Sequence, residues 1–82
     1  MDNKEIEFDF SKLKGRIKEI YGTQSAFSTA MLMNESTLSN KLNNNVQFSS
    51  KEIVRALLLL SLKFYEVKEY FFTLKVQKTE KD

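Results

Sequence analysis

Apolar residues recur at helical spacing along almost the whole chain, and no proline interrupts them. The sequence has only two glycines, at positions 15 and 22, so few positions force the backbone out of a helix. A chain of 82 residues forms one domain around a small core. The spacing therefore predicts an all-α fold, a compact bundle of about five short helices with an extended C-terminal tail.

Charge divides the chain into three parts. Residues 1–10 hold four acids and one base, whereas the rest of the chain holds twelve bases and seven acids. We expect an acidic N-terminal arm at residues 1–9, a helical domain at residues 10–74 and a charged C-terminal tail at residues 75–82. The mildly basic body favours an anionic partner, but a solvated surface of mixed charge fits the composition about equally well.

Missing residue types exclude several chemistries. The chain has no cysteine and no histidine, so it has no disulfide framework, no thiolate site and none of the imidazoles on which most zinc and general-base sites rely. No nucleophile with an adjacent base and no phosphate-binding glycine loop is present. Glu66 and Glu69 lie one helical turn apart, which is usual for a solvated face. We expect no enzyme, cofactor, metal or small-molecule substrate.

The sequence also indicates where the protein acts. The longest apolar run, Ala56 to Leu60, is far shorter than the roughly 20 residues that a membrane span needs. The acidic N-terminus lacks the basic start and apolar run of a signal peptide. We therefore expect a cytoplasmic protein that is not associated with a membrane, and bacterial or viral cytoplasm is compatible with this sequence.

The first helix follows from one apolar stripe and two boundary residues. Ser11 is a candidate N-cap, and Gly22 is a candidate stop because glycine accepts the left-handed conformation at helix ends. The stripe consists of Phe10, Leu13, Ile17, Ile20 and Tyr21.

Two short helices are predicted next. Thr23 can cap a helix that reaches about Met31, and Asn34 can cap another from Glu35 to about Leu42. The inward residues expected in the earlier helix are Ala26, Phe27, Ala30 and Met31. The later helix is polar and has only Leu38 and Leu42 as apolar anchors. A short apolar helix, a three-residue turn and a short polar helix form a helix-turn-helix, whose second helix is presented to the DNA major groove.

The remaining elements are less regular. An asparagine-rich loop is expected at residues 43–48, and Ser49 with Glu52 has the spacing of a capping box for a helix from about Ser50 to Leu62. A last helix is expected to reach about Phe72, followed by an extended tail. The alternation of Ile6, Phe8 and Phe10 suits a short strand or an extended arm that pairs with this tail.

The segment Thr23–Leu42 resembles the helix-turn-helix of phage Cro and repressor proteins. The chain from about Phe8 to Lys78 is similar to the small Cro-like regulators of prophages in Gram-positive bacteria. One residue departs from the family pattern, because Leu32 stands where the family usually has glycine. A bulky leucine would be strained there if the left-handed backbone of the turn were kept. Ser28, where alanine is frequent, is a milder change.

The resemblance implies sequence-specific binding of double-stranded operator DNA by a transcriptional regulator. The expected base contacts are Glu35, Ser36, Thr37 and Asn40. The expected phosphate contacts are Thr23, Gln24, Ser25, Asn34, Ser39, Lys41, Asn43 and Asn44, with Asn45 also plausible. The chemistry agrees for Asn40, whose amide can bond adenine bidentately. Glu35 suits a cytosine contact, a helix cap or the repulsion of wrong DNA equally well, and each of the others is also interpretable as a solvated polar residue or a loop former.

A polar helix without arginine lacks the common guanine contact, so we expect modest affinity per monomer and a homodimer on a two-fold operator. The expected dimer interface is Leu58, Leu59, Leu62, Phe64, Phe71 and Phe72, although most of these residues also suit the core. A second interpretation is a protein-interaction module or antirepressor built on a helix-turn-helix that does not bind DNA. Salt dependence separates the two, because each neutralised phosphate steepens the loss of affinity with salt.

Overall fold

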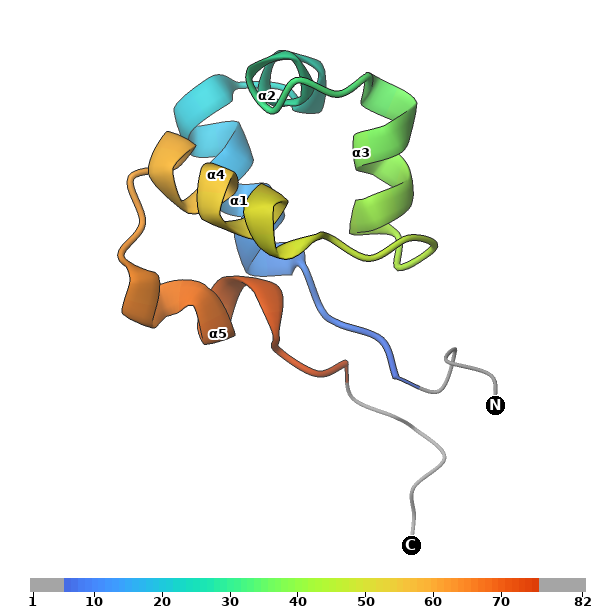
Figure 1. Cartoon of the computed structure of the whole chain (residues 1–82), viewed down its shortest axis with the longest axis vertical. Coiled ribbons are helices and arrows are strands. Elements are labelled where there is room, and N and C mark those ends of the chain that lie inside the picture. Colours follow the sequence, from blue (N-terminus) through green and yellow to red (C-terminus); the bar gives the residue numbers. More distant parts are fainter. Residues whose placement is uncertain (1–5, 76–82) are drawn as a thin grey trace, which may run out of the picture.

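The computed structural model describes residues 6–75, and it confirms the predicted all-α fold (Figure 1). The elements in chain order are α1 (Ser11–Tyr21), α2 (Gln24–Ala30), α3 (Glu35–Leu42), α4 (Ser50–Leu59), the 3-10 helix η2 (Phe64–Glu66) and α5 (Val67–Phe71). None of the helices in this part of the chain is long and apolar enough to cross a membrane.

The core is formed by leucine and aromatic side chains from every α-helix. The largest fully buried side chains are Phe27, Leu13, Ile17, Leu38 and Leu60. Complete burial of a leucine or phenylalanine side chain stabilises the folded state by about 1.5–3 kcal/mol. Helix α1 packs against α2 and α5, and α2 packs against α3, so the core fixes the position of the helix-turn-helix.

Three predicted helix starts are confirmed. The Thr23 hydroxyl accepts a hydrogen bond from the backbone N–H of the third residue of α2 at 3.0 Å. The Asn34 side-chain oxygen caps α3 in the same way at 2.9 Å. At α4, Ser49 and Glu52 form the predicted capping box, with bonds of 3.1 and 2.9 Å. Each cap satisfies backbone donors that a helix start leaves unpaired.

The predicted start of the first helix is wrong by one residue. Ser11 is the first residue of α1, and Phe10 occupies the N-cap position without a side-chain bond. The carboxylate of Asp9 accepts instead from the backbone N–H of Ser11 at 2.9 Å. The predicted stop is confirmed, because Gly22 has a φ of 85° at the end of α1.

Two other predictions about α2 and α4 need correction. Ala26 is exposed, and the buried positions of α2 are Phe27 and Ser28, so the inward face is rotated toward α1 and α3. Helix α4 ends at Leu59 and not at about Leu62. The chain turns there because Ser61 takes the left-handed conformation, with a φ of 56°.

The N-terminal arm pairs with the segment after α5, as predicted. Phe8 and Leu74 form an antiparallel bridge, flanked by a 2.7 Å bond from the N–H of Asp9 to Thr73 and a 2.9 Å bond from the N–H of Lys75 to Glu7. The two segments lie side by side below α1 and α5 (Figure 1). The predicted acidic arm and charged tail extend to residues 1–5 and 76–82, which lie outside the described residues.

Candidate regulatory surface of the helix-turn-helix

Helices α2 and α3 pack against each other and form the predicted helix-turn-helix. Figure 1 shows α2 end-on and α3 from the side, so the two helices cross at a steep angle. Leu38 and Leu42 anchor α3 in the core, as predicted. The opposite face of α3 is polar and solvent-facing: Glu35, Ser36, Asn40 and Asn43 are exposed, and Thr37 and Ser39 are half-buried.

Several residues predicted to contact DNA phosphates also shape the ends of these helices. The side chains of Thr23 and Asn34 act as caps, and the hydroxyl of Ser36 donates to the Asn34 side-chain oxygen at 3.0 Å. Ser25 is exposed and Gln24 is half-buried at the start of α2. The four predicted phosphate contacts at these helix starts, Thr23, Gln24, Ser25 and Asn34, therefore lie where backbone N–H groups favour anions.

The turn between α2 and α3 keeps its left-handed backbone despite the leucine. Leu32 has a φ of 64°, and its side chain is 76% exposed. The turn is closed by backbone bonds of 3.0 Å, from Leu32 to the carbonyl of Thr29 and from Met33 to that of Ser28. The left-handed conformation costs a residue with a Cβ about 1–2 kcal/mol. The predicted strain is therefore present, and the buried part of the side chain is too small to offset much of it.

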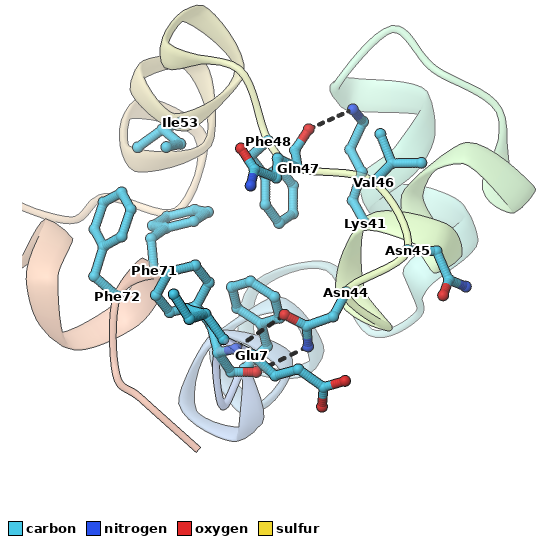
Figure 2. A pocket seen from close by; sticks show the side chains of 13 residues that line it. Glu7, Lys41, Asn44, Asn45, Val46, Gln47, Phe48, Ile53, Phe71 and Phe72 are labelled. Carbon is cyan, nitrogen blue, oxygen red and sulfur yellow. Dashed lines mark hydrogen bonds between the residues drawn. The ribbon is translucent and has the colours of Figure 1, made fainter. Parts of the chain in front are cut away.

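Lys41 points into the protein, which corrects its prediction as a phosphate contact. Its ammonium donates to the backbone carbonyl of Gln47 at 3.1 Å (Figure 2). The same ammonium lies 3.1 Å from the Glu52 carboxylate. Its side chain is only 9% exposed. The reason is visible in the spacing, because Lys41 follows the core residue Leu38 by three positions and shares its face of α3.

Glu52 is the charged partner of this lysine. Partial burial raises the pKa of the Glu52 carboxyl, but hydrogen bonds from the backbone of Ser49 and from Lys41, together with the lysine charge, outweigh burial and hold this pKa below its usual value. The pair joins α3 to α4 across the intervening loop. Sequence reasoning identified both residues and missed their contact.

Asn44 is the second residue with an internal role. Its side-chain oxygen accepts from the N–H of Phe8 at 2.9 Å, and its amide donates to the Phe8 carbonyl at 3.0 Å (Figure 2). Its backbone is left-handed, with a φ of 66°. Asn44 thus holds the arm against the end of α3, and its predicted phosphate contact is not available while these bonds exist. The amides of Asn43 and Asn45 make only long bonds of 3.4 Å, to Ser39 and Asn40.

The two hydrogen bonds between Asn44 and Phe8 form a clamp on the N-terminal arm. A groove of about 600 Å³ lies beside this clamp and is bounded by the arm, by α5 and by the loop that follows α3. Its wall is largely aromatic, with Phe8, Phe10, Phe48, Phe71 and Phe72 (Figure 2). No group of acidic residues in the described part of the chain is arranged to hold a metal ion.

The residues predicted for a dimer interface divide into two groups. Leu62 and Phe71 are buried in the core of the single chain, so they are unavailable to a partner, and Leu59 packs against that core. Leu58 and Phe64 are 76% and 73% exposed, and Phe72 is 44% exposed. Leu59, Leu62 and Phe71 belong to the core or pack against it because α5 packs against α1 and α4.

Together, the α2–α3 unit and the all-α core around it define a helix-turn-helix domain. The chain belongs to the family described as "Protein of unknown function (DUF739)", whose model matches residues 6–74. No curated protein sequence matches the chain significantly.

A solved structure is also similar to the chain: the solution structure of the modulator of repression (MOR) of the temperate bacteriophage TP901-1 from Lactococcus lactis. The two chains share 41% identity, and the match covers 85% of this chain and 95% of that chain, with a TM-score of 0.73. This similarity places the protein among phage-type regulatory proteins.

Proposed function

We propose that the protein modulates phage repression by binding another regulatory protein through the α2–α3 surface. The observation that carries this proposal is the charge of that surface. Residues 23–48 contain only two charged side chains, Glu35 and Lys41. The glutamate is exposed, whereas the lysine is buried and paired with Glu52. The helix-turn-helix segment therefore presents an acid and no free base.

Such a surface is poorly suited to holding DNA alone. Most of the affinity of DNA-binding proteins comes from basic side chains that neutralise phosphates and release counterions. Amide and hydroxyl side chains, such as Asn40 and Ser36, supply base recognition but little of this electrostatic attraction. A protein partner does not require a basic surface. The similarity to a phage modulator of repression supports the same interpretation.

The test uses the purified protein, the repressor of the same phage and the intergenic DNA beside the gene. Fluorescence anisotropy of labelled DNA is measured with each protein alone and with both, over about 50–200 mM salt, where phosphate contacts change affinity steeply. Labelled repressor is titrated with the protein in parallel. We expect binding to the repressor with weak salt dependence, and a changed affinity of the repressor for DNA. The proposal fails if the protein leaves the repressor unaffected.

The second candidate is direct operator binding as a homodimer, which is supported by the exposed polar face of α3 and its intact caps. In that case the protein alone binds its operator tightly, with affinity that falls steeply with salt. Asn40→Ala then weakens specific binding by about 1–3 kcal/mol and relaxes preference at one base position. Equilibrium sedimentation tests the dimer. A uniform loss on all DNA sequences would instead assign Asn40 to the DNA backbone.

A further inference from the structure

Four helices of this protein are followed by a residue in the left-handed conformation. These residues are Gly22 after α1, Leu32 after α2, Asn44 after α3 and Ser61 after α4, with φ values of 85°, 64°, 66° and 56°. Glycine adopts this conformation at no steric cost, and asparagine tolerates it better than most residues. Leu32, Asn44 and Ser61 close their turns with the same pair of backbone bonds, whereas Gly22, with a ψ of −42°, bonds back to Lys18. The reason for each side chain can therefore be compared.

Two of the four residues, Gly22 and Asn44, have a reason within the fold, and a third, Ser61, places only a small side chain at the strained position. Gly22 avoids the steric cost altogether. Asn44 uses its amide to bind both backbone groups of Phe8. Ser61 is small, and its carbonyl together with that of Leu60 accepts hydrogen bonds from Arg16.

Leu32 has no such reason. Its side chain is 76% exposed, so packing does not compensate the strain. The two hydrogen bonds that close the turn use only the backbone N–H groups of Leu32 and Met33, which a glycine would supply equally well. Backbone strain that no contact within the fold offsets is found most often at functional sites.

We propose that Leu32 is an apolar anchor that inserts into a pocket of a protein partner. Glu35, three residues further on, is exposed and is the only charged side chain presented by residues 23–48. An apolar anchor beside a carboxylate fits an apolar pocket with a basic side chain at its rim. DNA fits this pair less well, because phosphates repel the carboxylate and a leucine could contact only an apolar group such as a thymine methyl. This inference rests on the proposed function and deepens it by assigning the contact.

The test is a binding titration of the repressor of the same phage with four forms of the full chain. Leu32→Gly and Leu32→Asn remove the apolar side chain and keep a residue that tolerates the left-handed turn. Ser61→Gly makes the same backbone change at the other end of the domain and is the matched control. We expect both Leu32 variants to bind roughly 10- to 100-fold more weakly, the range expected for an interfacial leucine, and Ser61→Gly to bind like the wild type.

The outcomes separate this inference from the proposed function. Wild-type affinity of Leu32→Gly and Leu32→Asn for the repressor would overturn the anchor and leave the proposed function intact. Absence of repressor binding by the wild-type chain would overturn the proposed function, and the anchor with it. Thermal unfolding is measured for every variant, and a Leu32→Gly protein less stable than the wild type would show that the leucine serves the fold.

Discussion

The two ends of α3 are built in opposite ways. At its C-terminal end, Lys41 and Asn44 turn their polar groups inward and bind Glu52, the Gln47 carbonyl and Phe8. At its N-terminal end, Leu32 and Glu35 are exposed to solvent, and the side-chain hydrogen bonds are those of the Asn34 cap. Two residues predicted to contact DNA phosphates thus stabilise one end, while the other end carries an exposed apolar side chain on a strained backbone.

The difference between the two ends shows that the polar residues of one helix can have two roles, a structural role and a role in recognition. A polar residue near a helix end is as well suited to holding a loop as to meeting a ligand, and only its contacts distinguish the roles. If the comparison holds, substitutions at the C-terminal end of α3 lower stability, whereas substitutions at the N-terminal end alter partner binding and leave stability equal or higher.

Replacement of Lys41 should have the largest effect on the C-terminal end of α3, which we call the anchored end because its polar side chains bind within the protein. Lys41→Met keeps a side chain of similar length but removes the cation, leaving the Gln47 carbonyl without its donor and Glu52 without its ion pair. We expect the free energy of unfolding to fall by about 3 kcal/mol, near the low end for breaking a buried pair because the Glu52 side chain is 29% exposed. Urea denaturation followed by circular dichroism measures this loss.

Lys51→Met is the matched control for this prediction, because Lys51 lies beside Glu52 on α4 and is exposed. Its removal should change stability by less than about 0.5 kcal/mol. Equal losses for the two lysines would contradict an internal role for Lys41, and would return it to the set of free cations available for DNA.

Replacement of Asn44 tests the clamp on the arm. Asn44→Ala loses both hydrogen bonds to Phe8 and places an alanine at a φ of 66°, so we expect a loss of about 2 kcal/mol. Asn44→Gly loses only the bonds, because glycine tolerates the backbone, and should lose about 1 kcal/mol. Thermal unfolding compares the two, with the exposed Asn45→Ala as control. A glycine variant as stable as the wild type would show that the clamp contributes nothing.

Acid should weaken the anchored end through Glu52. Because the folded-state pKa of Glu52 lies below its ordinary value of 4.5, the ionised carboxylate stabilises the fold, fully above that value and progressively less as pH falls through the folded-state pKa. Glu52→Gln retains an acceptor for the cap but removes the charge. Between about pH 7 and pH 3, its stability should fall less than that of the wild type. Glu35→Gln, at an exposed position, is the control for the loss of one carboxylate.

The sequence predicts the local features of this molecule well and the distant ones poorly. The caps at Thr23, Asn34 and Ser49 were predictable because a cap joins residues three positions apart. The bond between Asn44 and Phe8 joins residues 36 positions apart, and no periodicity encodes it. The inward position of Lys41 had a local signal, its spacing from Leu38. That signal is easily missed, because a lysine side chain is rarely buried unless it forms an ion pair, as Lys41 does with Glu52.

The same limit applies to the recognition surface. The sequence marked Leu32 as unusual through its resemblance to proteins with glycine there, and it predicted strain. The sequence did not determine whether the turn would adopt another backbone conformation or keep the left-handed one with a leucine in it. The choice depends on the backbone bonds of the turn and on the packing of α2 against α3, which together hold the left-handed conformation.

Leu32→Gly therefore gives the smallest effect on the fold and the clearest contrast between the two ends of α3. Glycine removes the steric cost of the left-handed turn, but it also raises the entropy of the unfolded chain, so the expected gain is about 0.5–1 kcal/mol. Differential scanning calorimetry measures it, with Ser61→Gly as a reference for the same backbone change at φ 56°. A gain at position 32 would mean that the wild-type chain keeps a less stable turn, as the proposed contact of the leucine with a partner requires. A loss would mean that the side chain packs usefully on its own chain, and the two ends of α3 would then differ less than their contacts indicate.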